Sequence, residues 1–221
     1  YPVAAHTSYL INLGGSGAEV RARSRQALVR ELVRCEQLAI PMLVMHPGSH
    51  TGGGKEAGLA RLAGGLDRCL RESGVTRVRI LLETTAGQGT GLGATFAELR
   101  QILDRVKDPD RYGVCFDTCH VFAAGHDLST KAGYEATMEE FERVMGLSRI
   151  GFFHLNDSKT PCGSKRDRHE HIGLGHIGLS GFGLLLNDPR FHAVPIVLET
   201  PKGEDLELDM QNLKRLLSLL P

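Results

Sequence analysis

The sequence predicts an α/β fold of the TIM (β/α) barrel type, in which parallel strands alternate with the helices that cover them. Two observations indicate this fold. Short apolar runs alternate with longer segments of helical periodicity, which is the pattern of βα units. Each apolar run is also followed by a histidine or a carboxylate, as expected where the strands of a barrel end at one rim. The chain has 221 residues and 41% hydrophobic content, so it is long enough for one domain with its own core.

Six βα units are predicted in chain order. The expected strands are residues 2–5, 41–45, 78–82, 112–116, 150–153 and 195–198. The expected helices are residues 18–38, 56–71, 96–106, 134–145, 181–186 and 206–220. In the first helix, apolar residues such as Leu28, Leu32 and Cys35 recur on one face, as in a helix that packs on a sheet. No linker or low-complexity segment interrupts the alternation, so residues 1–221 are expected to form a single, partial TIM-barrel catalytic domain.

The composition narrows the functional classes. Lys plus Arg and Asp plus Glu both number 26, so any contact with nucleic acid has to be local. No apolar run approaches the roughly 20 residues of a membrane-spanning helix, and no secretory signal is visible. The five cysteines form no CxxC pair, which favours reduced thiols and a cytoplasmic protein. Several of the ten histidines stand beside Asp or Glu in glycine-rich stretches, which indicates metal chemistry.

The residues that follow the six apolar runs are all potential metal ligands. They are His6, His46, Glu83, Asp117, His154 and Glu199. Any one of them is explained equally well as a polar residue where the chain leaves the sheet, but chance does not explain a potential ligand at all six positions. Because the strand ends of a parallel barrel converge at one mouth, we expect these side chains to meet in space. Imidazole and carboxylate ligands suit zinc or manganese and leave positions open for water and substrate.

Further candidate ligands are expected in loops. Asp117 and His120 belong to the segment DTCH, and Asp167 and His169 belong to the segment DRH. In an extended DRH segment both outer residues point to one side, so His120, Asp167 and His169 are predicted to form a third metal site.

Glycine-rich loops at residues 46–54 and 86–93 would let the backbone approach a phosphate, although plain turn chemistry explains the glycines alone better. The histidines outside the ligand set are expected to be loop or supporting residues, and among them His50 is the best candidate for a substrate contact. These are His50, His126, His171, His176 and His192. Cys119 and Cys115 are expected to be structural.

Three motifs carry a resemblance to a known family. Residues 6–14 read HTSYLINLG, residues 113–120 read GVCFDTCH, and residues 154–169 contain HLNDSK, GS and DRH. Shorter blocks at residues 46–50 (HPGSH), 83–89 (ETTAGQG) and 198–200 (LET) complete the set. Together these motifs resemble the endonuclease IV family of abasic-site endonucleases over essentially the whole chain.

The resemblance implies three zinc ions per chain. His6, His46 and Glu83 would hold the first ion. Glu83, as a bridging ligand, would hold the second together with Asp117, His154 and Glu199. The third would be held by His120, Asp167 and His169.

The resemblance also implies an activity: hydrolysis of the phosphodiester 5′ to an abasic site in double-stranded DNA during base excision repair, leaving a 3′-OH and a 5′-deoxyribose phosphate. Glu83 and Glu199 would be catalytic, with Glu199 also orienting the attacking water. The resemblance implies Tyr9 and Leu10 as DNA-binding residues, and His50 and the basic Arg168 are further candidates for contact with DNA. Tyr9 and Leu10 would wedge into the base stack, with packing at the rim as their alternative role. We expect a monomer without an organic cofactor.

The chain departs from the family pattern at its N-terminus, where two of the eight βα units are missing ahead of the strand that ends in His6. We expect that these units were removed or that something else covers the gap. Two other functions fit part of the pattern. A metal-dependent sugar isomerase or epimerase of the same barrel class would use the strand-end ligands but not His120, Asp167 and His169. A catalytically inactive lesion-binding protein would not need so complete a ligand set.

Overall fold

The computed structural model describes residues 2–221. The chain divides into two compact units, Tyr1–Cys115 and Phe116–Pro221, with the boundary inside one β-strand. The expectation of a single domain stays a prediction. No helix in the described part of the chain is long and apolar enough to cross a membrane.

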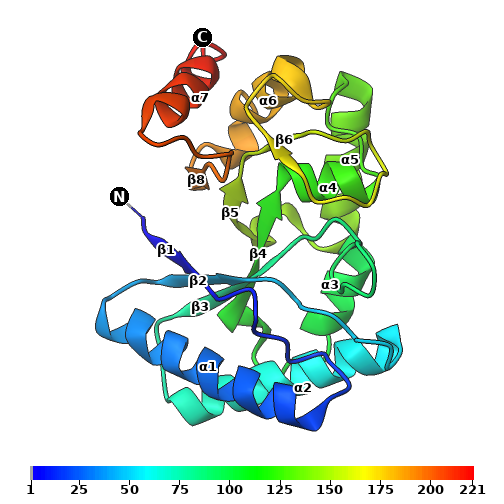
Figure 1. Cartoon of the computed structure of the whole chain (residues 1–221), viewed down its shortest axis with the longest axis vertical. Helices are drawn as coiled ribbons and strands as arrows, with labels where there is room; N and C mark the ends of the chain where they lie inside the picture. Colours follow the sequence, from blue (N-terminus) through cyan, green and yellow to red (C-terminus); the bar gives the residue numbers. More distant parts are fainter. Residues whose placement is uncertain (1) are drawn as a thin grey trace. The chain divides into compact units, whose positions relative to one another are not determined.

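The first unit is a parallel sheet with its connecting helices (Figure 1). Its strands, β1 (Ala4–His6), β2 (Met42–Met45), β3 (Arg79–Glu83) and β4 (Tyr112–Asp117), are neighbours in chain order. The helices α1 (Ala18–Gln37), α2 (Lys55–Ser73) and α3 (Phe96–Leu103) connect them, and a 3-10 turn, η1 (Pro109–Arg111), precedes β4. The register brings Ala5 beside Leu43, Leu43 beside Ile80 and Ile80 beside Tyr112. Consecutive parallel strands joined by helices are the βα units that the sequence predicts.

The core of this unit forms because both layers are apolar where they meet. The side chains of Leu28 and Leu32 in α1 and of Leu62 and Leu66 in α2 are completely buried. Figure 1 shows α1 and α2 side by side on one face of the β1–β2–β3 sheet. At the end of α2, Gly74 takes a left-handed φ of 66°, and its N–H donates to the carbonyl of Leu70 at 3.3 Å. Glycine suits this position because other residues are strained at positive φ.

The second unit contains the helices α4 (Thr118–Ala124), α5 (Lys131–Val144), α6 (Gly178–Leu186) and α7 (Glu207–Leu217). Its strands are β5 (Ile150–His154) and β8 (Ile196–Val197), which pair in parallel, and β6 (Asp157–Ser158) and β7 (His169–Glu170), which pair antiparallel. Two 3-10 turns, η2 (Leu147–Arg149) and η3 (Pro189–Phe191), precede β5 and β8. Phe116, Phe141 and Phe153 form edge-to-face ring contacts in its core.

Two parts of the second unit differ from the sequence prediction. His120 was expected in a loop but lies in α4, a helix of seven residues that Asp117 caps by accepting the backbone N–H of His120. So short a helix shows no recurring apolar face along the sequence. His169 was also expected in a loop but opens β7. A two-residue strand is too short to produce the alternation from which strands are predicted.

Candidate metal centre

Strand ends position most of the predicted ligands. His6, Glu83, Asp117 and His154 are the last residues of β1, β3, β4 and β5. His46 directly follows β2, and Glu199 lies two residues after β8. Within each unit the parallel strands therefore deliver these side chains at their carboxyl ends, as predicted.

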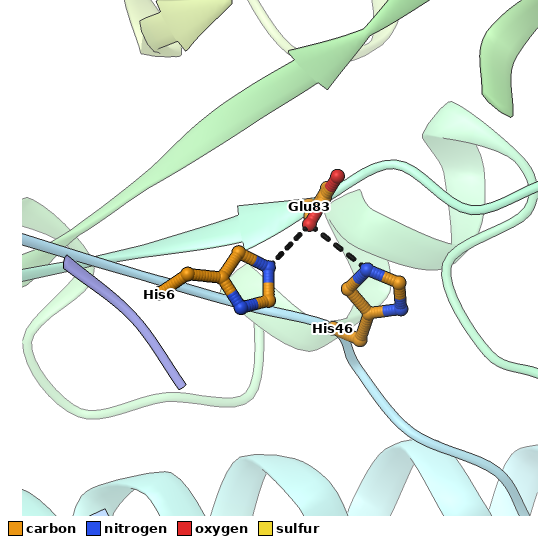
Figure 2. Close-up of side chains that lie close together, drawn as sticks. All are labelled: His6, His46 and Glu83. Atoms are coloured by element: carbon orange, nitrogen blue, oxygen red, sulfur yellow. Dashed lines mark hydrogen bonds and ion pairs between the residues drawn. The ribbon is translucent and has the colours of Figure 1, made fainter. Parts of the chain in front are cut away.

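One cluster lies in the first unit. Nε2 of His6 and Nε2 of His46 are 2.8 Å and 3.0 Å from the same oxygen, Oε2 of Glu83 (Figure 2). The Glu83 side chain is fully buried, whereas the two imidazoles are 31% and 37% exposed, so the cluster is anchored inside and open on its histidine side. Nδ1 of His6 lies 2.7 Å from the carbonyl oxygen of Thr7. A proton on Nδ1 would donate to that carbonyl and leave the Nε2 lone pair for a metal ion.

A second cluster lies in the other unit, at the end of β4 and β5. Nδ1 of His154 is 3.2 Å from Oε2 of Glu199 and 3.9 Å from Oδ2 of Asp117. One ligand atom from each of these residues lies within 4.8 Å of the others. Asp117 and His154 are buried, and the Glu199 side chain is 38% exposed. Glu199 is thus the member of this cluster that reaches solvent.

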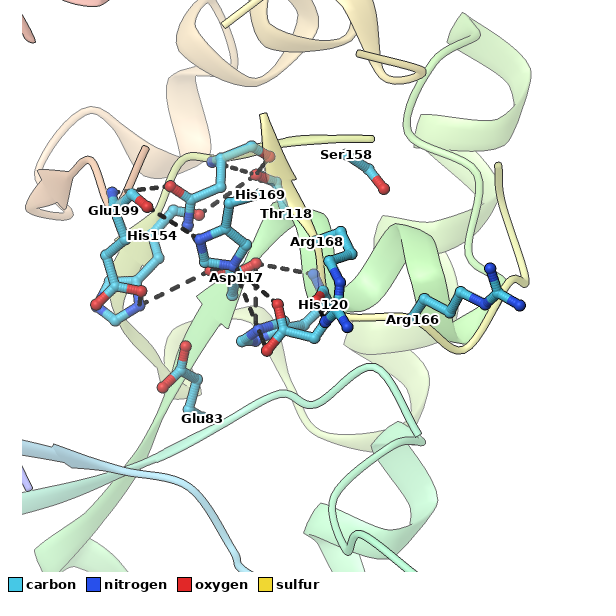
Figure 3. Close-up of polar contacts among 12 residues, drawn as sticks. Glu83, Asp117, Thr118, His120, His154, Ser158, Arg166, Arg168, His169 and Glu199 are labelled. Atoms are coloured by element: carbon cyan, nitrogen blue, oxygen red, sulfur yellow. Dashed lines mark hydrogen bonds and ion pairs between the residues drawn. The ribbon is translucent and has the colours of Figure 1, made fainter. Parts of the chain in front are cut away.

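The three residues predicted for a third site also converge within the second unit. Figure 3 shows two of them, His120 and His169, close to Asp117. Nε2 of His120 is 3.1 Å from Oδ2 of Asp167, and Nε2 of His169 is 3.3 Å from Oδ1 of the same carboxylate. The two imidazole Nε2 atoms are 3.4 Å apart. Nε2 of His169 also lies 3.8 Å from Oδ2 of Asp117, so this cluster adjoins the previous one. Each unit therefore gathers its predicted ligands, and the expectation that all nine share one rim stays a prediction.

Asn156 supports these ligands, although the sequence does not indicate it as a functional residue. Its side-chain N–H donates to Oδ2 of Asp117 at 2.6 Å, and its Oδ1 accepts the backbone N–H of Glu199 at 2.8 Å. The residue is completely buried. Its backbone N–H donates to Oγ1 of Thr118 at 2.9 Å, and that hydroxyl donates to the Asn156 carbonyl at 2.8 Å. Asn156 therefore holds both Asp117, at the end of β4, and Glu199, in the segment after β8. Supporting residues orient metal ligands in this way.

The remaining histidines lie outside the three clusters. His171 contacts the side-chain amide of Asn212, and His126 lies 3.4 Å from Glu140. Nδ1 of His50 is buried and has no hydrogen-bond partner among the described residues. His176 and His192 join no ligand group in the described part of the chain.

Cys115 and Cys119 are fully buried, as predicted. Burial, with a further contribution from the charge of Asp117, raises the pKa of the Cys119 thiol to about 12. At neutral pH the thiol is therefore protonated, which agrees with a structural role.

Three of the four predicted DNA-binding residues, Tyr9, Leu10 and Arg168, are exposed, whereas His50 is half-buried. Tyr9 and Leu10 follow β1 and have 86% and 73% of their surface accessible. Large hydrophobic side chains this exposed, side by side on a loop, are available to a partner. Leu10 also lines a groove of about 510 Å³ against α1, where Arg23 and Arg30 supply positive charge. Arg168 is exposed between the two ligands Asp167 and His169, so it can reach an anion beside the third cluster.

Comparison with known proteins first defines the class. The family described as "Xylose isomerase-like TIM barrel" matches residues 1–217, which confirms the predicted fold class. A crystal structure of a D-tagatose 3-epimerase-like protein is similar with a TM-score of 0.74, covering 98% of this chain and 77% of that one. At 19% identity this likeness shows the fold alone.

Closer relatives define the family within this class. "Probable endonuclease 4" of Chloroflexus aurantiacus is 51% identical over 220 residues, which are 100% of this chain and 77% of the relative. "Probable endonuclease 4" of Geotalea daltonii is 50% identical over 97% of this chain and 75% of its own length. The crystal structure of endonuclease IV from Thermus thermophilus has 36% identity and a TM-score of 0.86, covering 99% of this chain and 75% of that one. The chain belongs to the endonuclease IV family, as its motifs predicted, and is an enzyme of the hydrolase class.

Proposed function

We propose that the chain is a zinc-dependent AP endonuclease that hydrolyses the phosphodiester 5′ to an abasic site in double-stranded DNA, leaving a 3′-OH and a 5′-deoxyribose phosphate. The observation that carries the proposal is the convergence of the predicted ligands within each compact unit. Family membership supplies DNA as the substrate, since the relatives are named as endonucleases.

The donor atoms fit zinc. Each of the nine predicted ligands offers an imidazole nitrogen or a carboxylate oxygen, the donors that zinc takes at sites with open positions. Two ligand atoms at about 2.1 Å from a tetrahedral ion lie roughly 3.4 Å apart. The histidine–carboxylate contacts of the clusters, from 2.8 Å between His6 and Glu83 to 3.3 Å between His169 and Asp167, are close to this spacing. Small side-chain shifts would therefore suffice to admit an ion.

In the proposed reaction, the metal ions and the side chains would have different roles. Zinc ions held at these residues would lower the pKa of a bound water and neutralise charge on the phosphate oxygens. The chain would orient the reactants and handle the proton. Glu199 is the best-placed proton acceptor, because its carboxylate reaches solvent while Asn156 holds its backbone N–H. Exposed cations, Lys165, Arg166 and Arg168, would bind DNA phosphates near the third cluster.

Selectivity for abasic sites would come from the unstacked nucleotide. A nucleotide without a base costs less to extrude from the duplex than a normal one, and an inserted side chain can hold the gap open. Tyr9 and Leu10 are suited to this role because they are adjacent, large, apolar and exposed.

Replacing both Tyr9 and Leu10 with alanine is expected to raise KM for an abasic duplex about 10-fold or more, since each stacking contact is worth roughly 1–3 kcal/mol. The change should leave the thermal stability nearly unaltered, because both side chains are exposed. Steady-state nicking measures the effect. Leu38→Ala, which removes another exposed leucine of the same unit, is the matched control. An unchanged KM in the double variant would rule out the wedge.

The function is tested by nicking of a duplex that carries one synthetic abasic site. We expect a single cut on its 5′ side, a 3′ end that a DNA polymerase extends, and no cut in the undamaged duplex. A chelator should abolish the cut and added Zn²⁺ should restore it. Tight binding without a cut would instead favour a lesion-binding protein. One or two Mn²⁺ or Mg²⁺ ions per chain in place of about three Zn²⁺ would favour a sugar isomerase or epimerase.

A further inference from the structure

Asp157 is a completely buried carboxylate that the proposed reaction does not use. Its Oδ1 accepts the backbone N–H groups of Ser158 at 2.8 Å and Ile177 at 2.9 Å. Its Oδ2 accepts those of Gly173 at 2.9 Å, Gly175 at 3.1 Å and Gly178 at 3.2 Å. Burying a carboxylate away from solvent costs free energy unless hydrogen-bond donors surround it. The five backbone N–H donors, here called the amide cage, therefore stabilise the charge of the buried Asp157.

The cage is built by the loop at residues 173–178, and the loop is shaped for it. Gly173 and Gly178 have left-handed φ values of 78° and 71°. A side chain on Gly175 would place its Cβ 2.4 Å from the carbonyl oxygen of Ser158 and 2.5 Å from Oδ1 of Asp157. The loop can therefore close around the carboxylate only with glycine at these points.

The strand β6 contacts the loop of the cage on one side and pairs on the other with β7, which carries the candidate ligand His169. In the β6–β7 pair, Asp157 is opposite Glu170 and Ser158 is opposite His169. The carbonyl of Ser158 accepts the N–H of His176 from the caged loop at 2.8 Å. β6 is thus held between the loop and β7. The position of His169, whose Nε2 lies 3.3 Å from Asp167 and 3.4 Å from His120, depends on where β6 is held.

We propose that Asp157 is a positioning residue for the metal site of His120, Asp167 and His169. Its carboxylate ties the loop at residues 173–178 to β6, and the register of β6 with β7 then sets His169 against the other two ligands. The inference rests on the proposed metal-binding role of these three residues. It predicts that the affinity of this site for zinc depends on a carboxylate that never touches the ion.

The test is Asp157→Asn. The amide has the shape of the carboxylate but turns one acceptor atom into a donor that faces the backbone N–H groups. Zinc binding is titrated against a competing chelator and followed by the side-chain nitrogen NMR signals of the histidines. We expect the affinity reported by His120 and His169 to fall about 10- to 100-fold, the range for residues that support metal ligands. The signals of His6 and His46, in the other unit, should titrate as in the unchanged protein.

Two further variants make the result specific. Gly175→Ala crowds the cage from the loop side and should weaken the same metal site. It therefore also tests the proposal if Asp157→Asn does not fold. Asp127→Asn is the matched control, because Asp127 accepts the N–H and hydroxyl of Ser129 ahead of α5 and supports no candidate ligand. If His120 and His169 of the unchanged protein do not respond to Zn²⁺, the proposed ligand role fails. If they respond equally in the unchanged protein, Asp157→Asn and Gly175→Ala, the positioning role is wrong.

Discussion

Glu83→Gln is expected to lower nicking of an abasic duplex by more than about 100-fold, beyond the loss typical of residues that only support metal ligands. One oxygen of Glu83 contacts both His6 and His46, so this carboxylate is the centre of the first cluster. Glutamine keeps the size but lacks the negative charge that a zinc site requires. Bound zinc per chain, measured by elemental analysis, should fall together with the activity.

Glu98→Gln is the matched control for this loss. Glu98 is also a buried carboxylate of the first unit, but it accepts the backbone N–H groups of Gly93 and Ala94 and pairs with Lys55. Its replacement should reduce stability and leave the zinc content intact. Full nicking activity in Glu83→Gln, or an equal loss of zinc in both variants, would contradict the role of Glu83.

Asn156→Asp is expected to have the second largest effect. Asn156 is completely buried, and its side-chain N–H donates to Oδ2 of Asp117 at 2.6 Å. The change replaces this donor with a carboxylate oxygen. Two negative charges then face each other away from solvent, which disfavours the arrangement that holds Asp117 in place as a ligand. We expect the free energy of unfolding of the metal-free protein to fall by about 3 kcal/mol, as when a buried charge is left without its partner. Denaturant unfolding measures the change, and zinc content and nicking should fall with it.

Asn212→Asp separates this effect from the general cost of burying a charge. Asn212 is equally buried in the same unit, but its Oδ1 lies 3.3 Å from Arg215, and its amide contacts His171 and Thr200. Its replacement should destabilise the fold without removing zinc. Retention of zinc by Asn156→Asp would show that Asn156 does not orient Asp117.

Strand positions and strand-end ligands were predictable because each depends on local sequence. The apolar runs that give β2 and β3 are short and continuous, and His46 and Glu83 follow from where those runs stop. The supporting residues were not predictable in this way. Asn156 has no metal-ligand character, and its partners Asp117 and Glu199 are about forty residues away in either direction.

Short elements were missed for a related reason. The seven residues of α4 and the two of β7 place His120 and His169, yet neither is long enough to leave a period in the sequence. A local cap from Asp117 fixes the start of α4, and the pairing of His169 with Ser158, eleven residues away, fixes β7. The sequence therefore indicates which residues of these segments are ligands but not which backbone holds them.

The distribution of thiols has a practical consequence. Four of the five cysteines are buried, and Cys162, in the connection between β6 and β7, is exposed. Partial desolvation of the thiol and the nearby charge of Asp127 raise the pKa of Cys162, so its alkylation should be faster in mildly alkaline buffer than at neutral pH. A maleimide dye would therefore attach at a single place, on the segment that joins Ser158 to His169. The chain thus carries its own attachment point for a fluorophore on the segment between two residues of the β6–β7 pair.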